Sequence, residues 1–494
     1  MRFKILSISI FLLTSVLSYA QDWKTYPYTP SGSQVSFSID EGRHTSDPIE
    51  WWYTAGHITG ETSGKSFSYM LTYFYYPASI FDGFRIFNIT DDTTGEFYQD
   101  TQPLDYTTLS TTELDIEASL FFGGTETWTN KLDNLGAPIP FEYNLFAFAS
   151  FGNLNLEYET VKRPLILADD GYLNQGATSY TYYYSQTKNE VLGTITFDGS
   201  TENVIGTAWI DRQYGNFNPL NGEQYEWFSM QLSNGTDINL WNIFTSERTV
   251  PNNAQYRILA SYVDESTQYT SDDFQIERLA FNWMSDNLMC YSKQWRLTST
   301  INNLDLIITT LHDNTEVQLP FRFFEGSTTI SGTVNGVAVT GIGFAELLHS
   351  YENPDLTILS PIGGVYDTSL PITWQLNNPD DGRPIYYDLE YSIDNQQTFI
   401  PIVQGITETS YLYDGLGLNA NDEVWFKIIA YSIDGVLNNT IISTASSIAT
   451  LSSNEINELE IGFYPNPVVD ILTLKIPESI NKAAIQIIDV NGKV

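Results

Sequence analysis

Cysteine is almost absent from this chain of 494 residues, which contains Cys290 alone. A single cysteine excludes an internal disulfide framework and a cysteine-rich metal cluster. We expect Cys290 to be a small buried hydrophobic side chain. Histidine is also scarce, and His44, His312 and His349 lie too far apart to show the spacing of zinc ligands. The sequence therefore predicts neither a metal site nor a cofactor.

Positive charge is the second shortage. The chain has 22 lysines and arginines against 60 aspartates and glutamates, which gives a net charge of −38. Such a surface repels the phosphates of nucleic acids and the head groups of anionic membranes. We therefore expect no nucleic-acid partner.

Long apolar runs are missing after the N-terminus. The first twenty residues, "MRFKILSISIFLLTSVLSYA", carry basic Arg2 and Lys4, an apolar run over 5–16 and small residues at the end. This is the pattern of a signal peptide over residues 1–20, and we predict cleavage after Ala20. No cysteine follows the cleavage site, which argues against a lipoprotein. No later window reaches the ~20 apolar residues of a membrane helix, so no transmembrane segment is expected after cleavage.

Several common catalytic motifs are absent. The sequence has no G-x-S-x-G, H-E-x-x-H, P-loop or dinucleotide-binding fingerprint. These absences argue against a nucleophile elbow, a zinc-protease site and the usual nucleotide-binding loops.

Aromatic residues are abundant, with 32 tyrosines and 28 phenylalanines. "SFSYMLTYFYY" (66–76) alternates as a half-buried strand does, and no long stretch has helical periodicity. The pairing of an aromatic strand with an alternating one recurs in "WWYTAGHITGETSGKSFSYMLTYFYY" (51–76) and "YEWFSMQLSNGTDINLWNIF" (225–244). The sequence therefore predicts an all-β protein with two similar β modules in succession.

A change in pattern near Asn353 and Pro354 indicates a further domain. Trp374 lies on an early strand pattern, "YYDLEYSID" (386–394) is central and "VWFKIIAYS" (424–432) is late. This spacing predicts a fibronectin type III-like β-sandwich over residues 353–450. A polar linker over 451–460 then leads to the C-terminal segment, 461–494.

Five motifs in order carry a resemblance to a known family. They are "EWWYTAGHITG" (50–60), "SYTYYYSQ" (179–186), "GTAWIDRQYG" (206–215), "KQWRL" (293–297) and "FFEGSTTISGTVNGVAVTGIGFAEL" (323–347). Together they resemble the family of AttH and the carotenoid 1,2-hydratase CrtC, or hydroxyneurosporene synthase. The resemblance implies two tandem lipocalin-like barrels, over 21–200 and 201–352, and an isoprenoid or other apolar ligand.

The C-terminal segment carries a second resemblance. "FYPNPVVDILTLKI" (463–476), followed by "IIDVNGKV", resembles the sorting domain that directs Bacteroidetes proteins through type IX secretion. The resemblance implies the type IX machinery as a partner and a location outside the cell or on its surface, reached through the periplasm. The family pattern continues beyond "NGKV", so we expect the sorting domain to be truncated at Val494.

The resemblance to the hydratases also implies a site. Their His, Trp, Tyr and Asp positions correspond here to Tyr182, Tyr184, Trp209 and Asp211, so Asp211 keeps the acid. Residues two apart on a strand share a face. We therefore expect these four side chains to line one cavity of a few hundred cubic ångströms, the usual size of a small-ligand site.

The chemistry that the hydratases imply needs one acid among aromatic rings. A carboxyl group in an apolar cavity has a raised pKa and can protonate an alkene. Aromatic faces stabilise the carbocation by ~1–2 kcal/mol or more each when desolvated, and water then captures it. The alternative for Asp211 is a structural role, as a turn cap or in an ion pair with a base such as Arg212.

The stretch that opens the family region contributes further candidates. Trp51 and Trp52 should point to opposite faces of a strand, one into a barrel and the other between the barrel and its neighbour. Trp52 and His57 are candidate ligand contacts, although core packing and a hydrogen bond at the barrel end are the competing interpretations. Glu50 should be a buried partner of an Arg or a Tyr, since an unpaired carboxylate there is costly.

Glu325 and Glu346 lie in strand patterns punctuated by glycine. We expect both to be structural partners rather than acids.

Three functions fit these patterns. The first is a hydratase or cyclase-like enzyme for an apolar isoprenoid or acyl compound, the second a non-catalytic binder or carrier of such a compound, and the third a structural or adhesive module. Asp211 facing an apolar cavity without a basic partner favours the enzyme, whereas an ion pair with Arg212 favours the binder. A barrel filled by side chains, without a cavity, favours the third.

Overall fold

The structure is a computed structural model that describes residues 22–77, 80–218, 222–366, 370–414, 418–419, 422–448, 462–464, 470–475 and 486. Strands dominate these residues, with short 3-10 turns such as η1 (Ile39–Glu41) and η3 (Ala254–Tyr256), and they contain no α-helix. The prediction of an all-β protein is confirmed. The predicted signal peptide, 1–20, lies outside the described residues. No helix within those ranges is long and apolar enough to cross a membrane.

The first sheet closes into a barrel of ten strands, because β8 pairs with β11 as well as with β7. Two short strands, β9 and β10, attach to β11. The strands of this sheet are β1 (Ile49–Gly60), β2 (Ser66–Tyr75), β3 (Gly83–Asp91), β4 (Glu96–Leu109), β5 (Asp115–Leu120), β6 (Thr125–Leu132), β7 (Pro138–Ala149), β8 (Gly152–Thr160), β9 (Leu165–Ile166), β10 (Tyr172–Gln175), β11 (Ser179–Phe197) and β12 (Ser200–Gly215).

The alternation of β2 shows how the sequence builds this barrel. Phe67, Tyr69, Leu71 and Tyr73 point into the barrel and join its core. Met70, on the opposite face, joins a second apolar cluster outside the barrel. Both faces of β2 are therefore buried, and Ser68 and Thr72 share the second face with Met70.

The second sheet is an open, curled half-barrel. Its order is β16-β15-β14-β13-β22-β21-β19-β18-β17, with β20 on β21, and within the described residues β16 and β17 do not pair. The strands are β13 (Gln224–Leu232), β14 (Asp237–Phe244), β15 (Arg257–Asp264), β16 (Thr267–Ser271), β17 (Gln275–Trp283), β18 (Cys290–Ser299), β19 (Leu304–Thr310), β20 (Glu316–Val317), β21 (Phe323–Val334) and β22 (Val337–Leu347).

Two details differ from the expected pair of barrels. The second sheet does not close, and the chain leaves the first sheet after Gly215 rather than at residue 200. The reason is that β12 pairs along its length with both β1 and β11 and thus completes the first barrel. Cys290 is fully buried, as expected, in a small apolar cluster.

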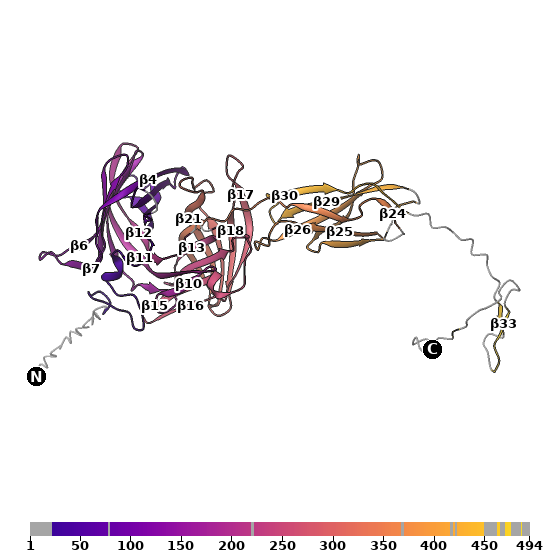
Figure 1. The fold of residues 1–494 in the computed structure, drawn as a ribbon, viewed down its shortest axis with the longest axis horizontal. Coiled ribbons are helices and arrows are strands. Elements are labelled where there is room, and N and C mark those ends of the chain that lie inside the picture. The colour runs from indigo at the N-terminus through magenta and orange to yellow at the C-terminus, as the bar shows by residue number, and fades with distance from the viewer. Residues whose placement is uncertain are drawn as a thin grey trace, which may run out of the picture. The chain divides into compact units, whose positions relative to one another are not determined.

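The outer face of the barrel packs against the half-barrel (Figure 1). One apolar cluster spans the two sheets: it takes Tyr53 and Met70 from the barrel, and Trp227, Trp241 and Phe344 from the half-barrel. The barrel and the half-barrel also have separate interior cores. The layer between the sheets is therefore a third core, and it holds the candidate site.

A second compact unit comprises 355–377, 386–430 and 439–494. It contains a three-stranded sheet, β23-β25-β28, and a six-stranded sheet, β24-β31-β29-β26-β27 with β30 on β29. Trp374 on β25 is buried and meets Tyr387 on β26 edge-on, with ring centroids 5.2 Å apart. The strands are β23 (Leu356–Ser360), β24 (Gly364–Tyr366), β25 (Leu370–Leu376), β26 (Ile385–Ser392), β27 (Ile400–Ile406), β28 (Ser410–Tyr413), β29 (Glu423–Ser432), β30 (Asn438–Ile442) and β31 (Ser446–Ile448).

This unit has the two sheets of a sandwich, and its fibronectin type III-like character stays a prediction. Segments 378–385 and 431–438, which fall within the predicted domain 353–450, group with the first unit instead. In the C-terminal segment, β32 (Gly462–Tyr464) and β33 (Thr473–Lys475) form an antiparallel pair. The predicted linker, 451–460, lies outside the described residues.

Candidate functional site

A narrow cavity, here called the inner cavity, lies between the barrel and the half-barrel. Its volume is about 30 Å³. Aromatic side chains form most of its wall, and two carboxyl groups interrupt them. The lining residues are Trp51, Tyr53, Met70, Thr72, Phe74, Ile86, Tyr183, Asp211, Phe217, Tyr225, Trp227, Trp241, Phe321, Phe323 and Glu346.

A larger apolar space, here called the outer chamber, adjoins the inner cavity. Its volume is about 430 Å³, and the two spaces share Trp51, Phe74 and Phe321. Residues from the barrel and from the segment before β21 enclose it. They are Ile49, Trp51, Phe74, Tyr76, Phe81, Gly83, Phe84, Thr101, Pro103, Asn218, Leu319, Pro320 and Phe321. The outer chamber can therefore take an apolar molecule, whereas the inner cavity beside the carboxyl groups has room for about one or two water molecules.

Asp211 is the carboxyl group that the barrel contributes. It lies on β12 directly opposite Tyr53 on β1 and Ser185 on β11, so that three adjacent strands place these side chains in one row. The Trp209 indole N–H donates to Asp211 Oδ1 at 2.6 Å, and the Tyr183 hydroxyl donates to Oδ2. Trp209 thus shares a face with Asp211 but lies behind the acid rather than in the cavity wall.

The protonation state of Asp211 is set mainly by burial. Burial raises its pKa to about 7, although hydrogen bonds from Ser185, Tyr183 and Trp209 act in the opposite direction. In the described part of the chain, no Lys, Arg or His forms an ion pair with it. Near neutral pH, Asp211 therefore holds a proton for a large fraction of the time.

Tyr183 connects Asp211 to the half-barrel. Its hydroxyl oxygen accepts hydrogen bonds from Asn239 Nδ2 at 2.8 Å, from Trp227 Nε1 at 3.2 Å and from Trp241 Nε1 at 3.3 Å. Because three N–H groups point at the Tyr183 oxygen, the O–H group of Tyr183 points to Asp211. The two sheets together therefore hold the acid in place.

The half-barrel contributes two more carboxyl groups, Glu325 on β21 and Glu346 on β22, which are direct cross-strand partners. The Tyr53 hydroxyl donates to Glu325 Oε1 at 2.9 Å, and the Tyr225 hydroxyl donates to Glu346 Oε1. Burial, followed by the charge of Glu346, raises the pKa of Glu325 well above its usual range. Burial raises the pKa of Glu346 to about 7.

These glutamates were expected to be ordinary structural partners, and their proximity to Asp211 was not anticipated. Neither forms an ion pair with a base in the described residues. One sequence signal could have found them. Phe323 and Glu325, and likewise Phe344 and Glu346, repeat the aromatic-x-carboxyl spacing of Trp209-x-Asp211.

Tyr182 and Tyr184 do not lie in the site, so the expectation that they line the cavity with Asp211 is wrong. Tyr184 points to the opposite face of β11, where it packs against Phe37 and donates to Asp40 O at 3.3 Å. Tyr182 stacks on Tyr214. The residue between them, Tyr183, contacts the acid, because side chains alternate along a strand.

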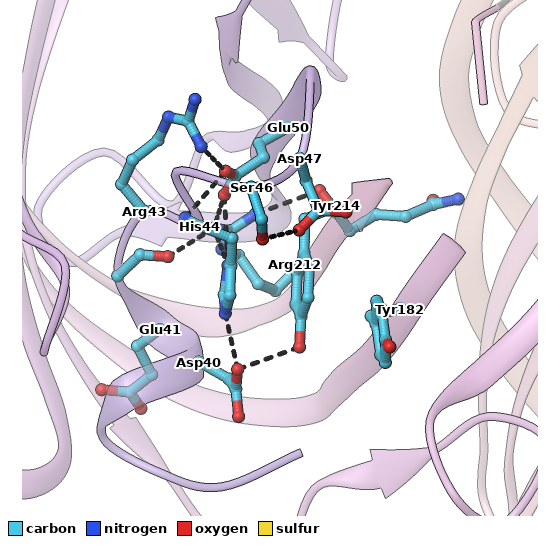
Figure 2. Close-up of polar contacts among 12 residues, drawn as sticks. Asp40, Glu41, Arg43, His44, Ser46, Asp47, Glu50, Tyr182, Arg212 and Tyr214 are labelled. Carbon is cyan, nitrogen blue, oxygen red and sulfur yellow. Dashed lines mark hydrogen bonds and ion pairs between the residues drawn. The ribbon is translucent and has the colours of Figure 1, made fainter. Parts of the chain in front are cut away.

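Arg212 does not pair with Asp211 either, since it points to the other face of β12. It forms a buried ion pair with Glu50, which Arg43 also contacts (Figure 2). His44 Nδ1 lies 3.3 Å from Glu50 Oε2, and Asp40 Oδ1 is 2.5 Å from His44 Nε2. Burial raises the pKa of Glu50, but the Arg212 charge and the hydrogen bonds outweigh it and the net shift is downward. Glu50 is therefore a buried acid with basic partners, as predicted.

The two tryptophans of "EWWYT" point to opposite faces, as predicted. Trp51 lines both the inner cavity and the outer chamber. Trp52 belongs to the barrel core, where its indole N–H donates to Glu41 O at 2.9 Å. Trp51, and not Trp52, is therefore the tryptophan of this pair that faces the two spaces.

His57 also lies outside the two spaces. Its Nε2 is 2.6 Å from Ser327 Oγ on β21, and its ring lies against Phe344, with centroids 4.8 Å apart. Burial lowers its pKa to about 4, so the ring is neutral at physiological pH. His57 joins β1 to the half-barrel rather than lining the cavity. In the described residues, no group of three or more His, Cys, Asp or Glu side chains is arranged to hold a metal ion.

Comparisons with known proteins agree with this fold. Residues 28–351 match the AttH-like family, and residues 462–494 match the secretion system C-terminal sorting domain. Kievitone hydratase from Fusarium solani subsp. phaseoli is 22% identical over 352 residues, which cover 66% of this chain and 92% of that protein.

Two solved structures share the fold of the first unit. One is a Nitrosomonas europaea protein assigned as an AttH, with a TM-score of 0.51 and 20% identity over 66% of this chain and 99% of that one. The other is kievitone hydratase from Nectria haematococca, with a TM-score of 0.50 and 15% identity over 66% of this chain and 98% of that one. The sorting domain indicates secretion to the cell surface or outside through the type IX machinery. The chain belongs to the AttH-like family and carries a C-terminal secretion sorting domain.

Proposed function

We propose that the first unit is a hydro-lyase that adds water to a carbon–carbon double bond of an isoprenoid or other apolar compound. One observation carries this proposal: Asp211 is a buried carboxyl group that faces an aromatic cavity and has no basic partner among the described residues. This is the arrangement that distinguishes an acid catalyst from a carboxylate held in an ion pair. The distant likeness to kievitone hydratase supports the same class of reaction.

In this reaction the Asp211 O–H bond breaks and its proton forms a C–H bond with one alkene carbon. The π electrons supply that bond, and the other carbon becomes a carbocation. Water adds its oxygen to the cation and then loses a proton, which leaves an alcohol. The net reaction is alkene plus water to alcohol.

The wall of the inner cavity suits the intermediate. Trp51, Tyr53, Trp227 and Trp241 line it, and the face of an aromatic ring attracts a cation by ~1–2 kcal/mol or more when water is excluded. The outer chamber can hold the apolar skeleton, since its wall is almost entirely apolar. In this proposal the outer chamber binds the substrate, and the reaction takes place in the inner cavity.

A carrier of apolar compounds is the second candidate, and the outer chamber favours it, because a cavity of this size and polarity binds without any acid. The two candidates differ in what Asp211 contributes. Asp211→Asn keeps the shape and removes the acid, so it should lower turnover strongly in an enzyme and leave binding by a carrier unchanged. The structural or adhesive module requires no such cavity, and it predicts no bound compound.

The test begins with the secreted protein. Native mass spectrometry and organic extraction should identify a co-purifying apolar compound. Hydration of that compound, and of farnesol as a defined isoprenoid alkene, is then followed by incorporation of oxygen from labelled water. We expect Asp211→Asn to lower turnover by ~10²-fold or more, which is the usual contribution of a general acid. Unchanged turnover in Asp211→Asn would defeat the mechanism.

A further inference from the structure

We propose that Glu346 is a second catalytic residue of this site, which accepts the proton of the attacking water while Asp211 donates a proton to the alkene. The inference rests on the proposed hydro-lyase function and adds a base to it. Asp211 comes from β12 of the barrel and Glu346 from β22 of the half-barrel, and both line the inner cavity. A molecule between the two sheets would therefore have one carboxyl group on each side.

Tyr53 shows that the carboxyl groups are close together. Its hydroxyl donates to Glu325. Burial, and then the charges of Glu325, Glu346 and Asp211, raise the pKa of Tyr53 well above its usual range. One buried hydroxyl is thus within electrostatic reach of all three carboxyl groups.

The groups that face Glu346 include no base. The titratable side chains around it are Tyr225 on β13, Glu325 on β21, Tyr53 on β1, Tyr183 on β11 and Asp211 on β12. His57, the histidine of β1, is neutral at physiological pH and its Nε2 lies 2.6 Å from Ser327 Oγ. In the described residues, a negative charge on Asp211 or Glu346 is therefore opposed by the other and compensated by no cation.

This arrangement favours one shared proton. Burial raises the pKa of Asp211 to about 7, and burial together with the charge of Asp211 raises the pKa of Glu346 to about 7. Two like charges in one low-dielectric cavity resist ionising together, so near neutral pH the state with one acid and one carboxylate is favoured. Addition of water to an alkene through a carbocation needs a proton donor in the first step and a proton acceptor when water has added.

The step balances without a further reactant. The proton of Asp211 goes to carbon as the C=C π bond breaks. The oxygen of water bonds to the other carbon, and its O–H bond breaks as the proton goes to Glu346. When the alcohol leaves, the proton passes from Glu346 back to Asp211 through water in the cavity, and the starting state is restored.

Glu325 is a positioning residue in this scheme. It faces Glu346 across the strand pair but does not line the cavity. One of its oxygens, Oε2, has no hydrogen-bond partner among the described residues. Burial and the charge of Glu346 raise the pKa of Glu325 well above its usual range, which favours placing the negative charge of the pair on Glu346.

The first test needs no substrate. Carboxyl stretching bands in the infrared report the protonation of individual buried acids as pH crosses neutrality. We expect Asp211→Asn to lower the pKa of Glu346, and Glu346→Gln to lower that of Asp211, by about one unit or more, the coupling expected for a proton-sharing pair. Tyr225→Phe, which removes only a donor to Glu346, should raise the pKa of Glu346. Unshifted values in both single variants would overturn the proton sharing.

The second test is kinetic and uses hydration of farnesol in labelled water. Glu346→Gln should lower turnover by ~10²-fold or more, and Glu346→Asp should recover part of it, because a carboxylate returns. The control is Glu277→Gln, which replaces an exposed carboxyl group on β17 and should leave turnover unchanged.

Full turnover in Glu346→Gln together with loss of turnover in Asp211→Asn would overturn the second acid–base role and leave the proposed hydro-lyase function intact. If wild type hydrates no alkene, the proposed function fails, and the titration still decides whether the carboxyl pair shares a proton.

Discussion

The Tyr183 hydroxyl donates a hydrogen bond to Asp211 across the β11–β12 pair. The oxygen of the same hydroxyl accepts hydrogen bonds from three half-barrel side chains, Asn239, Trp227 and Trp241. The acid lies on one sheet, and the groups that orient its partner lie on the other. The site therefore exists only when the two sheets are packed together.

Tyr183→Phe should disturb this network without removing the acid. Asp211 loses one donor to its carboxylate, so its pKa should rise above the value of about 7. Asn239, Trp227 and Trp241 lose an acceptor, which should lower the free energy of unfolding by about 1–3 kcal/mol. Urea unfolding and infrared titration of Asp211 measure the two effects. Tyr182→Phe, on the other face of β11, is the matched control and should leave the Asp211 pKa unchanged.

The raised pKa of Asp211 also predicts how stability depends on pH. The folded protein keeps the proton up to about pH 7, whereas the unfolded chain releases it near pH ~3.9. Between these values the folded state binds more protons, so this group's contribution to stability is greatest at low pH and is lost as pH rises toward 7.

Replacing Asp211 by Asn removes that loss. The melting temperature of the variant relative to wild type should therefore increase between pH ~3.9 and about pH 7 and level off above. Thermal unfolding followed by circular dichroism at a series of pH values gives this difference. Glu277→Gln, with its exposed side chain, should show no such trend. A difference that is constant with pH would contradict the buried neutral acid.

Glu50 has the opposite dependence, because its pKa is lowered by Arg212 and its other partners. Its stabilising contribution is present above the unfolded pKa and is lost as pH falls through the folded value. Glu50→Gln leaves Arg212 buried without its carboxylate and should cost about 3–5 kcal/mol in the free energy of unfolding at neutral pH, with a smaller cost in acid.

Urea unfolding at two pH values measures both effects. The comparison variant is Glu159→Gln, which removes a partly exposed ion pair with Lys24. Exposed pairs contribute about 0–1 kcal/mol, so its effect should be near zero. An equal cost for the two variants would contradict a stabilising role for the ion pair of Glu50 with Arg212.

The sequence was sufficient for the features that depend on local alternation. It predicted the all-β class, the alternating strand over 66–76 and the opposite directions of Trp51 and Trp52. The pairing of Trp209 with Asp211 followed from the same rule of residues two apart. Each of these needs only the geometry of a single strand.

Features that depend on pairing between distant strands could not be predicted. "SYTYYYSQ" is aromatic on both faces, so its pattern does not say which tyrosine faces Asp211, and a register irregularity between Gln186 and Asn189 interrupts the pairing of β11 with β12. Glu325 and Glu346 meet Asp211 only because two sheets pack together. The closure of the barrel likewise depends on the pairing of β8 with β11.

The sorting domain predicts the route of export. Deletion of 462–494, the region matched by the sorting-domain family, should leave the protein in the periplasm. Immunoblots of periplasmic and culture fractions make the measurement. Asp211→Asn with the tail intact is a control that should be exported normally. Normal export of the tailless chain would rule out the assigned role of this segment.

Replacing the adjacent residues Trp51 and Trp52 by alanine should have different effects, one mainly on ligand binding and the other mainly on stability. Trp51 lines the inner cavity and the outer chamber, so Trp51→Ala removes a wall of the binding space. Trp52 is 2% exposed in the barrel core, so Trp52→Ala opens a cavity there and should cost about 3–5 kcal/mol of stability.

Urea unfolding and farnesol binding by tryptophan fluorescence separate the two effects. Trp51→Ala should weaken binding about tenfold or more, equivalent to ~1.4 kcal/mol, with a smaller loss of stability than Trp52→Ala. If Trp51→Ala binds farnesol as wild type does, the outer chamber is not the ligand site, and the carrier and hydratase proposals both lose their binding space.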